Sequence, residues 1–240
     1  MKRQKIRKFL LLISFLLFPA TFYYLSPYLI LSGGFSGIIS GSLIIFAVQF
    51  ITSLIFGRAF CGWICPAGCL QDGCSEAVNK KVSKKVNWIK YLIWFPWLLA
   101  IVLGFVKAGG VKGVDFFYFT DHGISAAGVV GYINYFFVVG LIIIVSLLVG
   151  RRGMCHTLCW MAPFMILGTK IKNRLRIPSL RLKATPDKCS GCGLCTKNCP
   201  MSLDVKEMVQ ENDMRNDECI LCGECADNCA KKAIRLTFKR

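Results

Sequence analysis

Two related stretches near the end of the chain decide its fold: CSGCGLCTKNCP at residues 189–200 and CILCGECADNCA at residues 219–230. Both have the spacing Cys-x-x-Cys-x-x-Cys-x-x-x-Cys. With this spacing, a tight loop directs three thiolates at one [4Fe-4S] cluster, and the fourth cysteine starts a helix and binds the other cluster. The sequence therefore predicts an α+β domain of the bacterial 2[4Fe-4S] ferredoxin type over residues 185–240.

The same rule predicts how the eight cysteines divide between two clusters. One set comprises Cys189, Cys192, Cys195 and Cys229, and the other comprises Cys219, Cys222, Cys225 and Cys199. Structural zinc sites rarely use such a crossed pattern, and cytoplasmic thiols stay reduced, so zinc and disulfides are poor alternatives. Glycines at 191, 193 and 223 fit a close approach of the backbone to the clusters. Ala230 stands where a proline is expected, which weakens the turn signal and removes no ligand.

The rest of the chain is too apolar for a soluble domain, since 55% of the 240 residues are hydrophobic. Four apolar stretches approach the ~20 residues that cross a bilayer as a helix. They are predicted at Phe9–Ile30, Ile38–Gly57, Trp88–Val106 and Gly131–Gly150. The fold class predicted for residues 1–168 is therefore an α-helical membrane domain with four transmembrane helices.

Charge orients this predicted domain. Basic residues gather at positions 2–8, between spans two and three, and at Arg151 and Arg152, whereas the outer loops carry no net charge. Because cytoplasmic loops are rich in Lys and Arg, we expect a multi-pass protein of a prokaryotic inner membrane, with both termini and the ferredoxin domain in the cytoplasm. Residues 169–184 are predicted to form a basic linker along the anionic lipid leaflet. The net charge of +17 thus reflects topology, and we predict no nucleic-acid partner.

A repeat within the membrane part suggests a further centre. The segments GRAFCGWIC at 57–65 and GRRGMCHTLC at 150–159 each follow a pair of predicted helices. Parallel helix-pair repeats would bring Cys61, Cys65, Cys155 and Cys159 together at the membrane edge, as an additional iron–sulfur or metal centre. The alternative is that they are small apolar residues of buried helices. Cys69 and Cys74 could complete a site within one repeat, although Pro66 would bend the helix between them.

The remaining polar residues favour few other functions. With only His122 and His156, a bis-histidine haem across a helix pair is excluded, and Cys-x-x-Cys-His is absent. His156 is expected to support neighbouring ligands rather than to bind metal itself. Asp121 and His122 could release protons at an outer quinol site, but such a pair is usually just solvated. The spans hold almost no ionisable residues, which argues against a transporter.

The four spans, the Cys61-x-x-x-Cys65-Pro66 motif, its partner motif and the tandem ferredoxin runs resemble the membrane-bound polyferredoxins of the NapH/NosR type. The likeness covers nearly the whole chain and implies 4Fe-4S quinol dehydrogenase or electron-transfer membrane proteins. Cys61, Cys65, Cys155 and Cys159 match the membrane-edge motif cysteines of that family. Trp160 replaces the proline expected after Cys159, so the two motifs need not do the same job.

The predicted function is electron transfer between a cytoplasmic carrier, such as a ferredoxin or flavodoxin, and membrane quinone or a partner redox subunit. The basic inner face favours an acidic carrier. Such a chain would be the electron-transfer subunit of a quinol dehydrogenase, and we assign it no catalytic residue. The alternative is an iron–sulfur redox sensor or a maturation factor for a neighbouring enzyme.

Overall fold

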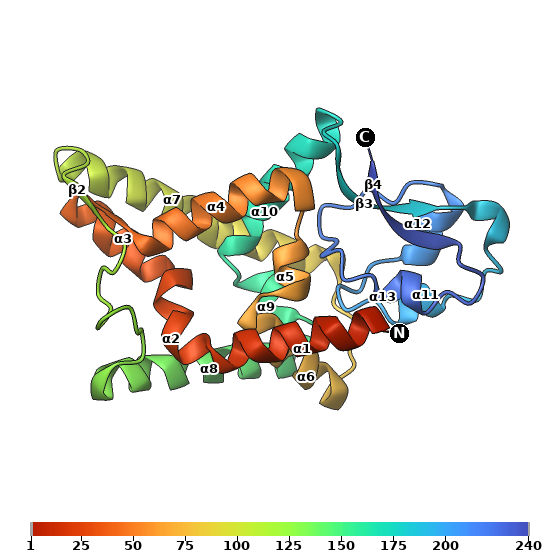
Figure 1. Ribbon diagram of the computed structural model, residues 1–240, viewed down its shortest axis with the longest axis horizontal. Coiled ribbons are helices and arrows are strands. Elements are labelled where there is room, and N and C mark those ends of the chain that lie inside the picture. Colours follow the sequence, from red (N-terminus) through yellow and green to blue (C-terminus); the bar gives the residue numbers. More distant parts are fainter. Residues whose placement is uncertain (1, 240) are drawn as a thin grey trace.

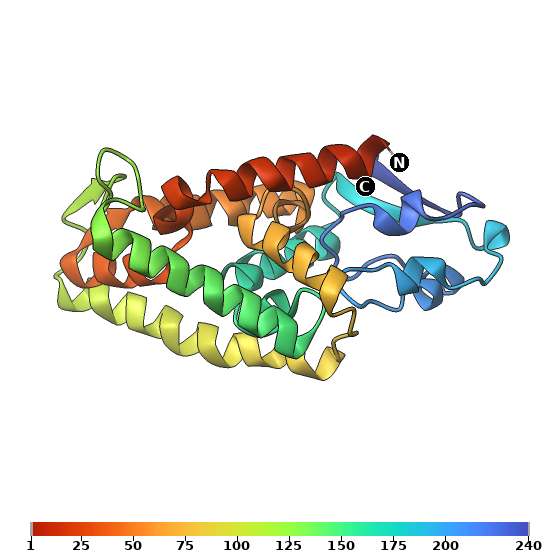
Figure 2. The ribbon, with the colours of Figure 1, turned by 90° about the horizontal axis from the view of Figure 1, so that it is seen from below.

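The computed structural model describes residues 2–239 and is elongated, with a helical membrane half (residues 2–177) beside a ferredoxin half (residues 178–239) (Figure 1, Figure 2). The membrane half contains α1 (Lys2–Leu16), α2 (Phe18–Thr21), η1 (Phe22–Leu25), α3 (Pro27–Ser36), β1 (Ile38–Ser40), α4 (Gly41–Phe56), α5 (Ala59–Trp63), α6 (Pro66–Ala77), η2 (Lys84–Trp88), α7 (Ile89–Lys107), β2 (Gly113–Asp115), α8 (Gly128–Val149), α9 (Gly153–Thr157) and α10 (Met161–Arg174). The ferredoxin half contains β3 (Ser179–Ala184), η3 (Pro186–Lys188), α11 (Leu194–Lys197), α12 (Val205–Gln210), α13 (Glu224–Asp227) and β4 (Ile234–Lys239).

Two helices are long and apolar enough to cross a membrane: the segment Lys84–Lys107, which includes α7, and the helix α8. They match the third and fourth predicted spans. The first predicted span is not one straight helix, because the chain bends by 60° between Lys2–Leu16 and Phe18–Leu25. Pro19 and Pro27 lie in the first turns of α2 and α3, where a missing N–H is tolerated and an earlier helix ends. The second predicted span is α4, which has 16 residues.

Reciprocal packing joins the two motif-bearing parts of the membrane half. The helix after each cysteine motif packs on the long helix before the other motif, so α6 contacts α8 and α10 contacts α4. The short helices α5 and α9 lie at the end of the membrane half that faces the ferredoxin half (Figure 1). Small β1 and β2 strands pair in parallel at the opposite end.

The ferredoxin half begins earlier than the sequence predicted. Residues Ser179–Ala184 form β3, which pairs antiparallel with β4 along its whole length, from Ser179 opposite Lys239 to Ala184 opposite Ile234. The predicted linker over 169–184 is therefore wrong, since its first residues end α10 and its last six form this strand. Leu182 and Ala184 are buried, whereas Lys183 is exposed, so the basic residues of the outer face had concealed a strand pattern.

One of two buried apolar clusters among residues 2–239 runs through both halves. It joins Phe46 and Met165 of the membrane half to Met201 and Ile220 of the ferredoxin half. Burial of this kind fixes one part against the other, because apolar contacts across the boundary would be lost on separation. The ferredoxin half is thus packed on the membrane half rather than tethered to it.

Candidate iron–sulfur sites and the adjoining cavity

The two ferredoxin loops have the same backbone conformation, offset by thirty residues. Positive φ angles occur at Gly191 (73°) and Leu221 (50°), and again at Gly193 (74°) and Gly223 (76°). Helices α11 and α13 follow at equivalent positions, and a further left-handed residue follows each fourth cysteine. Such turns place successive amide groups around a concave space, as ligands of an anionic cluster require.

The structure places Cys199 with the second loop, as the crossed pattern predicts. Cys199 lines one small cavity together with Cys219, Cys222 and Cys225. Burial raises the pKa of Cys219 to about 11 and that of Cys222 to about 12, so a bare thiolate is disfavoured there. Iron coordination would supply the missing positive charge, and the donor set therefore fits a [4Fe-4S] cluster.

The other loop lies nearer to solvent. Among the fourteen cysteines, all of them free thiols, Cys192 is the exposed one, whereas Cys189, Cys195 and Cys229 are half-buried. The backbone N–H of Ala233 donates to the sulfur of Cys229 at 3.3 Å. By the symmetry of the two loops, Cys229 corresponds to Cys199 and would serve the first loop.

The four motif cysteines of the membrane half come together as the repeat predicts. Cys61, Cys65, Cys155 and Cys159 line one cavity between the ends of α5, α6 and α9. The two motifs begin with the same turn. The N–H of Cys61 donates to the backbone carbonyl of Arg58, and the N–H of Cys155 donates to the backbone carbonyl of the matching Arg152. After the motifs the two repeats differ, because α6 begins directly at Pro66, whereas Trp160 precedes α10, which begins at Met161.

Polar and soft side chains support these four thiols. Gln71 is fully buried and bonds Cys155 twice, with its Nε2 3.4 Å from the sulfur and its Oε1 3.3 Å from the backbone nitrogen. The sulfur of Cys61 lies 3.9 Å from the sulfur of Met165. Such contacts orient ligands and restrict water at a metal centre.

Two fully buried arginines accompany the four cysteines, and the sequence interpretation missed them. Arg58 pairs with Glu218, and Arg152 donates to Asp72 at 2.8 Å and to the carbonyl of Cys61 at 2.5 Å. Burial alone would lower the pKa of Arg58, but Cys61 and Glu218 outweigh it and raise the pKa. Both arginines lie three residues before the first cysteine of their motifs, and that repeated position is the signal that could have revealed them.

Four thiols from two motifs are the number that a [4Fe-4S] cluster would need, one for each iron atom. No three His, Cys, Asp or Glu side chains among residues 2–239 converge closely enough to hold one metal ion. Thiolates that each bind a different iron atom stand further apart, around a larger centre. Arg58 Nε and Nη2 are buried without a hydrogen-bond partner in residues 2–239, and donors of this kind suit the sulfides of an anionic cluster.

The second ferredoxin loop lies directly on the first membrane-edge motif. A Cβ atom at Gly62 would lie 2.3 Å from the carbonyl oxygen of Ile220, so only glycine permits this approach. Trp63 Nε1 donates to the carbonyl of Leu221 at 3.1 Å. The cysteines of the second loop are therefore next to the membrane-edge cysteines, whereas the first loop carries the exposed Cys192.

An apolar cavity of 510 Å³ opens from the four membrane-edge cysteines into the membrane half. Phe18, Phe22, Val138 and Ile142 contribute to its walls, which come largely from the bent segment after α1 and from α8. Asn134 adds an amide whose Nδ2 lies 3.5 Å from the Tyr23 hydroxyl. Its size and lining suit a ligand with an apolar ring and tail.

Other candidate residues lie elsewhere. His156 is buried, its Nδ1 is 2.6 Å from Asn87, and burial lowers its pKa to about 4, in keeping with a supporting role. Cys69 lines a separate groove and Cys74 is half-buried, and neither lines the four-cysteine cavity. His122 and Asp121 are exposed and contact each other at 2.7 Å.

Comparison with known proteins shows iron–sulfur domains in both halves. A 4Fe-4S binding domain family matches residues 41–85 and 130–178, and a 4Fe-4S dicluster domain family matches residues 188–234. The first match covers α4–α6 and α8–α10 and includes both membrane-edge motifs.

Relatives are distant. An uncharacterized protein of Methanocaldococcus jannaschii is 25% identical over 78% of this chain and 67% of its own length. YccM of Escherichia coli, assigned by name to electron transport, is 22% identical over 80% of this chain and 54% of its own length. The methylamine utilization ferredoxin-type protein MauN of Methylobacillus flagellatus is 25% identical over 72% of this chain and 60% of its own length. The chain thus spans about half to two thirds of these relatives, and no solved structure matches it.

Proposed function

We propose that this chain, which belongs to a polyferredoxin-like family of 4Fe-4S proteins, relays electrons between a soluble carrier and the membrane through three iron–sulfur centres in series. The first centre is held by Cys189, Cys192, Cys195 and Cys229, and the second by Cys219, Cys222, Cys225 and Cys199. The third is held by Cys61, Cys65, Cys155 and Cys159.

The observation that carries this proposal is the contact of the second ferredoxin loop with Gly62 and Trp63, inside the first membrane-edge motif. Electron transfer needs neighbouring centres, and this contact puts a buried donor set against the membrane-edge donor set. The exposure of Cys192 supports a first centre that a soluble carrier could reach. An acidic ferredoxin or flavodoxin suits the basic protein.

The membrane side of the relay is proposed to be quinone in the 510 Å³ cavity, which begins at the third centre. The orientation proposed from the basic loops has four membrane crossings, with the bent α1–η1 segment and α4 as the first two, and the ferredoxin half in the cytoplasm of a prokaryote. A sensor or maturation factor would need neither the cavity nor the serial contact.

The first test is the iron and acid-labile sulfide content of anaerobically purified protein, with redox-titrated EPR. Wild type is compared with the double variant Cys61→Ser/Cys155→Ser and with Cys74→Ser as the matched control. Three centres give about twelve iron per chain, and the double variant loses about four together with one signal. About eight iron in wild type, with spectra unchanged by the double substitution, would leave a two-cluster ferredoxin and overturn the third centre.

The quinone cavity has a separate test on one helix. Leu141 of α8 lines the cavity, whereas Leu148 of the same helix is 72% exposed on its outer surface. Leu141→Trp should slow re-oxidation of the dithionite-reduced protein by a soluble quinone analogue, and Leu148→Trp should not. Equal rates in the two variants would remove the cavity from the mechanism. A sensor would show no rapid re-oxidation by the analogue in any variant.

A further inference from the structure

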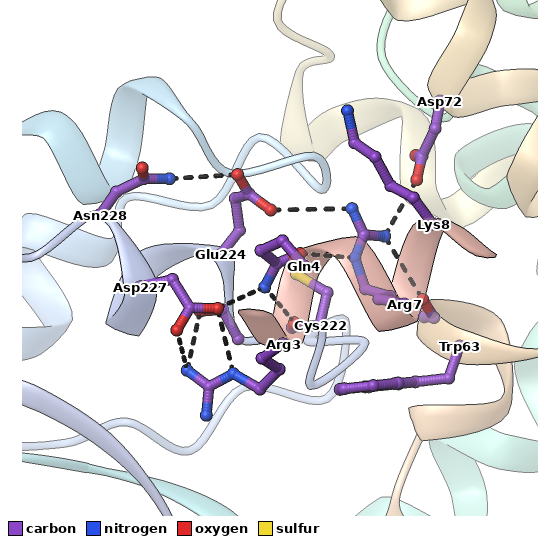
Figure 3. A network of polar contacts seen from close by, with 12 residues as sticks. Arg3, Gln4, Arg7, Lys8, Trp63, Asp72, Cys222, Glu224, Asp227 and Asn228 are labelled. Atoms are coloured by element: carbon purple, nitrogen blue, oxygen red, sulfur yellow. Dashed lines mark hydrogen bonds and ion pairs between the residues drawn. The ribbon is translucent and has the colours of Figure 1, made fainter. Parts of the chain in front are cut away.

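The basic amino-terminal segment contacts the ferredoxin half, although its charge alone had suggested only a topology signal. Arg3 Nη2 lies 2.6 Å from Asp227 Oδ1. Gln4 Nε2 donates to the carbonyl of Cys222 at 2.9 Å and to Asp227 Oδ2 at 2.6 Å. Figure 3 shows these side chains pointing from α1 toward α13 and the second ferredoxin loop. The start of α1 therefore holds the loop that carries the second donor set.

Arg7 stands one turn further along α1 and contacts both halves at once (Figure 3). Its side chain is 4% exposed, and its Nη1 lies 3.3 Å from the carbonyl of Gly62 and 3.0 Å from Asp72 Oδ2. Its Nη2 lies 3.6 Å from Glu224 Oε2. Gly62 follows the first membrane-edge cysteine, and Glu224 precedes the last cysteine of the second loop. A buried cation thus lies between the two donor sets.

The position has an electrostatic consequence. Each thiolate-bound cluster becomes more negative when it accepts an electron, and a buried cation beside it stabilises that reduced form more strongly than an exposed one would. Asp72 links Arg7 to Arg152, which in turn donates to the carbonyl of Cys61. Without Arg7, the negative charges of Asp72 and Glu224 would be less neutralised, and they would disfavour the reduced cluster further.

We infer that Arg7 is the positioning residue of the contact between the second and third centres, and that its charge favours the reduced state of the second cluster. This inference rests on the proposed function. The step concerned is a one-electron transfer, in which one cluster is oxidised as the other is reduced, and no bond forms or breaks. Arg7 acts by holding the two loops together and by its charge, without carrying the electron.

The test compares Arg7→Gln with Arg7→Lys and with Arg3→Gln as the matched control. Arg3 belongs to the same helix and also pairs with an acidic residue of α13, but its side chain is 33% exposed. Each variant is purified anaerobically, its iron content is measured, and the second cluster is titrated by EPR. Flash or stopped-flow reduction then gives the rate at which electrons reach the third centre.

We expect Arg7→Gln to lower the reduced-to-oxidised ratio of the second cluster by about tenfold at a fixed solution potential, which is about 59 mV for a one-electron couple. In Arg7→Lys the reduction potential of the second cluster should stay near the wild-type value, because the charge is kept. Electron transfer to the third centre should still be slower, because an ammonium group cannot make the divergent hydrogen bonds of a guanidinium. Arg3→Gln should change the potential and the rate less than Arg7→Gln does, because its charge is a third exposed and its polar contacts are with the ferredoxin half alone.

A wild-type potential and rate in Arg7→Gln, with full iron content, would overturn the inference and leave the three-centre relay intact. Equal shifts in Arg7→Gln and Arg3→Gln would also overturn it, because the effect would then be general to the segment. If Arg7→Gln loses iron, the result for Arg7→Lys is decisive. A slower electron transfer at a near wild-type reduction potential supports the inference, and an unchanged transfer rate refutes it.

Discussion

Substitution of Gly62 by alanine should separate the second and third centres without touching a ligand. The added Cβ would lie 2.3 Å from the Ile220 carbonyl oxygen and 3.4 Å from its carbonyl carbon. Both neighbours are backbone atoms, so no side chain can rotate away. The loop must move by about 1 Å to restore an ordinary contact, and overpacking of this kind costs about 1–3 kcal/mol.

That cost would act on the contact between the two halves. A penalty of about 1–3 kcal/mol changes the ratio of docked to undocked loop by about 5–150-fold. We expect faster hydrogen exchange in the second ferredoxin loop of Gly62→Ala, together with slower reduction of the membrane-edge centre. Iron content and the rate of dithionite reduction of the first cluster should stay at the wild-type level.

The control is Gly73→Ala, because a Cβ at Gly73 of α6 meets nothing within 4 Å. This change should leave the transfer rate unaltered, and it should stabilise the helix by about 1 kcal/mol, since alanine is the better helix former. The reasoning fails if Gly62→Ala matches Gly73→Ala in both hydrogen exchange and transfer rate.

Three further outcomes follow from the described contacts. Arg58→Met should lower stability by about 1–3 kcal/mol in thermal or denaturant melts in detergent, because it removes one of the two buried cations that pair with Glu218 and leaves only Lys90. Arg215→Met, at an exposed ion pair, should leave the midpoint unchanged, and equal effects would contradict the importance of burial. Chelator should remove about four iron first from the cluster beside the exposed Cys192. If the EPR signal of the second ferredoxin cluster disappeared before that of the first, this order of iron removal would be wrong. Gly168→Ala should destabilise the crossing of α10 and α4 by about 1–3 kcal/mol, since its Cβ would lie 1.7 Å from the Ser53 hydroxyl. The double variant Gly168→Ala/Ser53→Ala should recover most of the lost stability. If the effects of the two substitutions on the melting midpoint simply add, the contact is contradicted.

Local pattern was enough to predict much of the molecule. The spacing of the ferredoxin cysteines depends on short loops, and the structure gives both loops the same turns. Length and apolarity were enough to predict α7 and α8, because a spanning helix satisfies its own backbone. The repeated Cys-x-x-x-Cys motifs were enough to predict that four distant cysteines come together, and in the structure they line one cavity.

Other features were beyond local pattern. Hydropathy could not show that the first predicted span bends by 60°, because apolarity is the same on both sides of the bend. The sequence predicts a linker where β3 lies, because basic residues alternate with apolar ones there and only the partner strand β4, fifty residues away, makes the segment a strand.

The sequence by itself determined which residues can bind iron, because ligand type and spacing are local properties of the chain. Only the tertiary structure decided the order of the donor sets, with the second ferredoxin loop seated on Gly62 and Cys192 of the first loop exposed. The tertiary structure likewise gave two buried charges their place between those sets, because Arg7 contacts Gly62 and Glu224, and Arg58 pairs with Glu218. A charged side chain is hydrated in the unfolded chain. Once folding buries it, it needs an opposite charge or hydrogen bonds, and the fold determines which groups provide them.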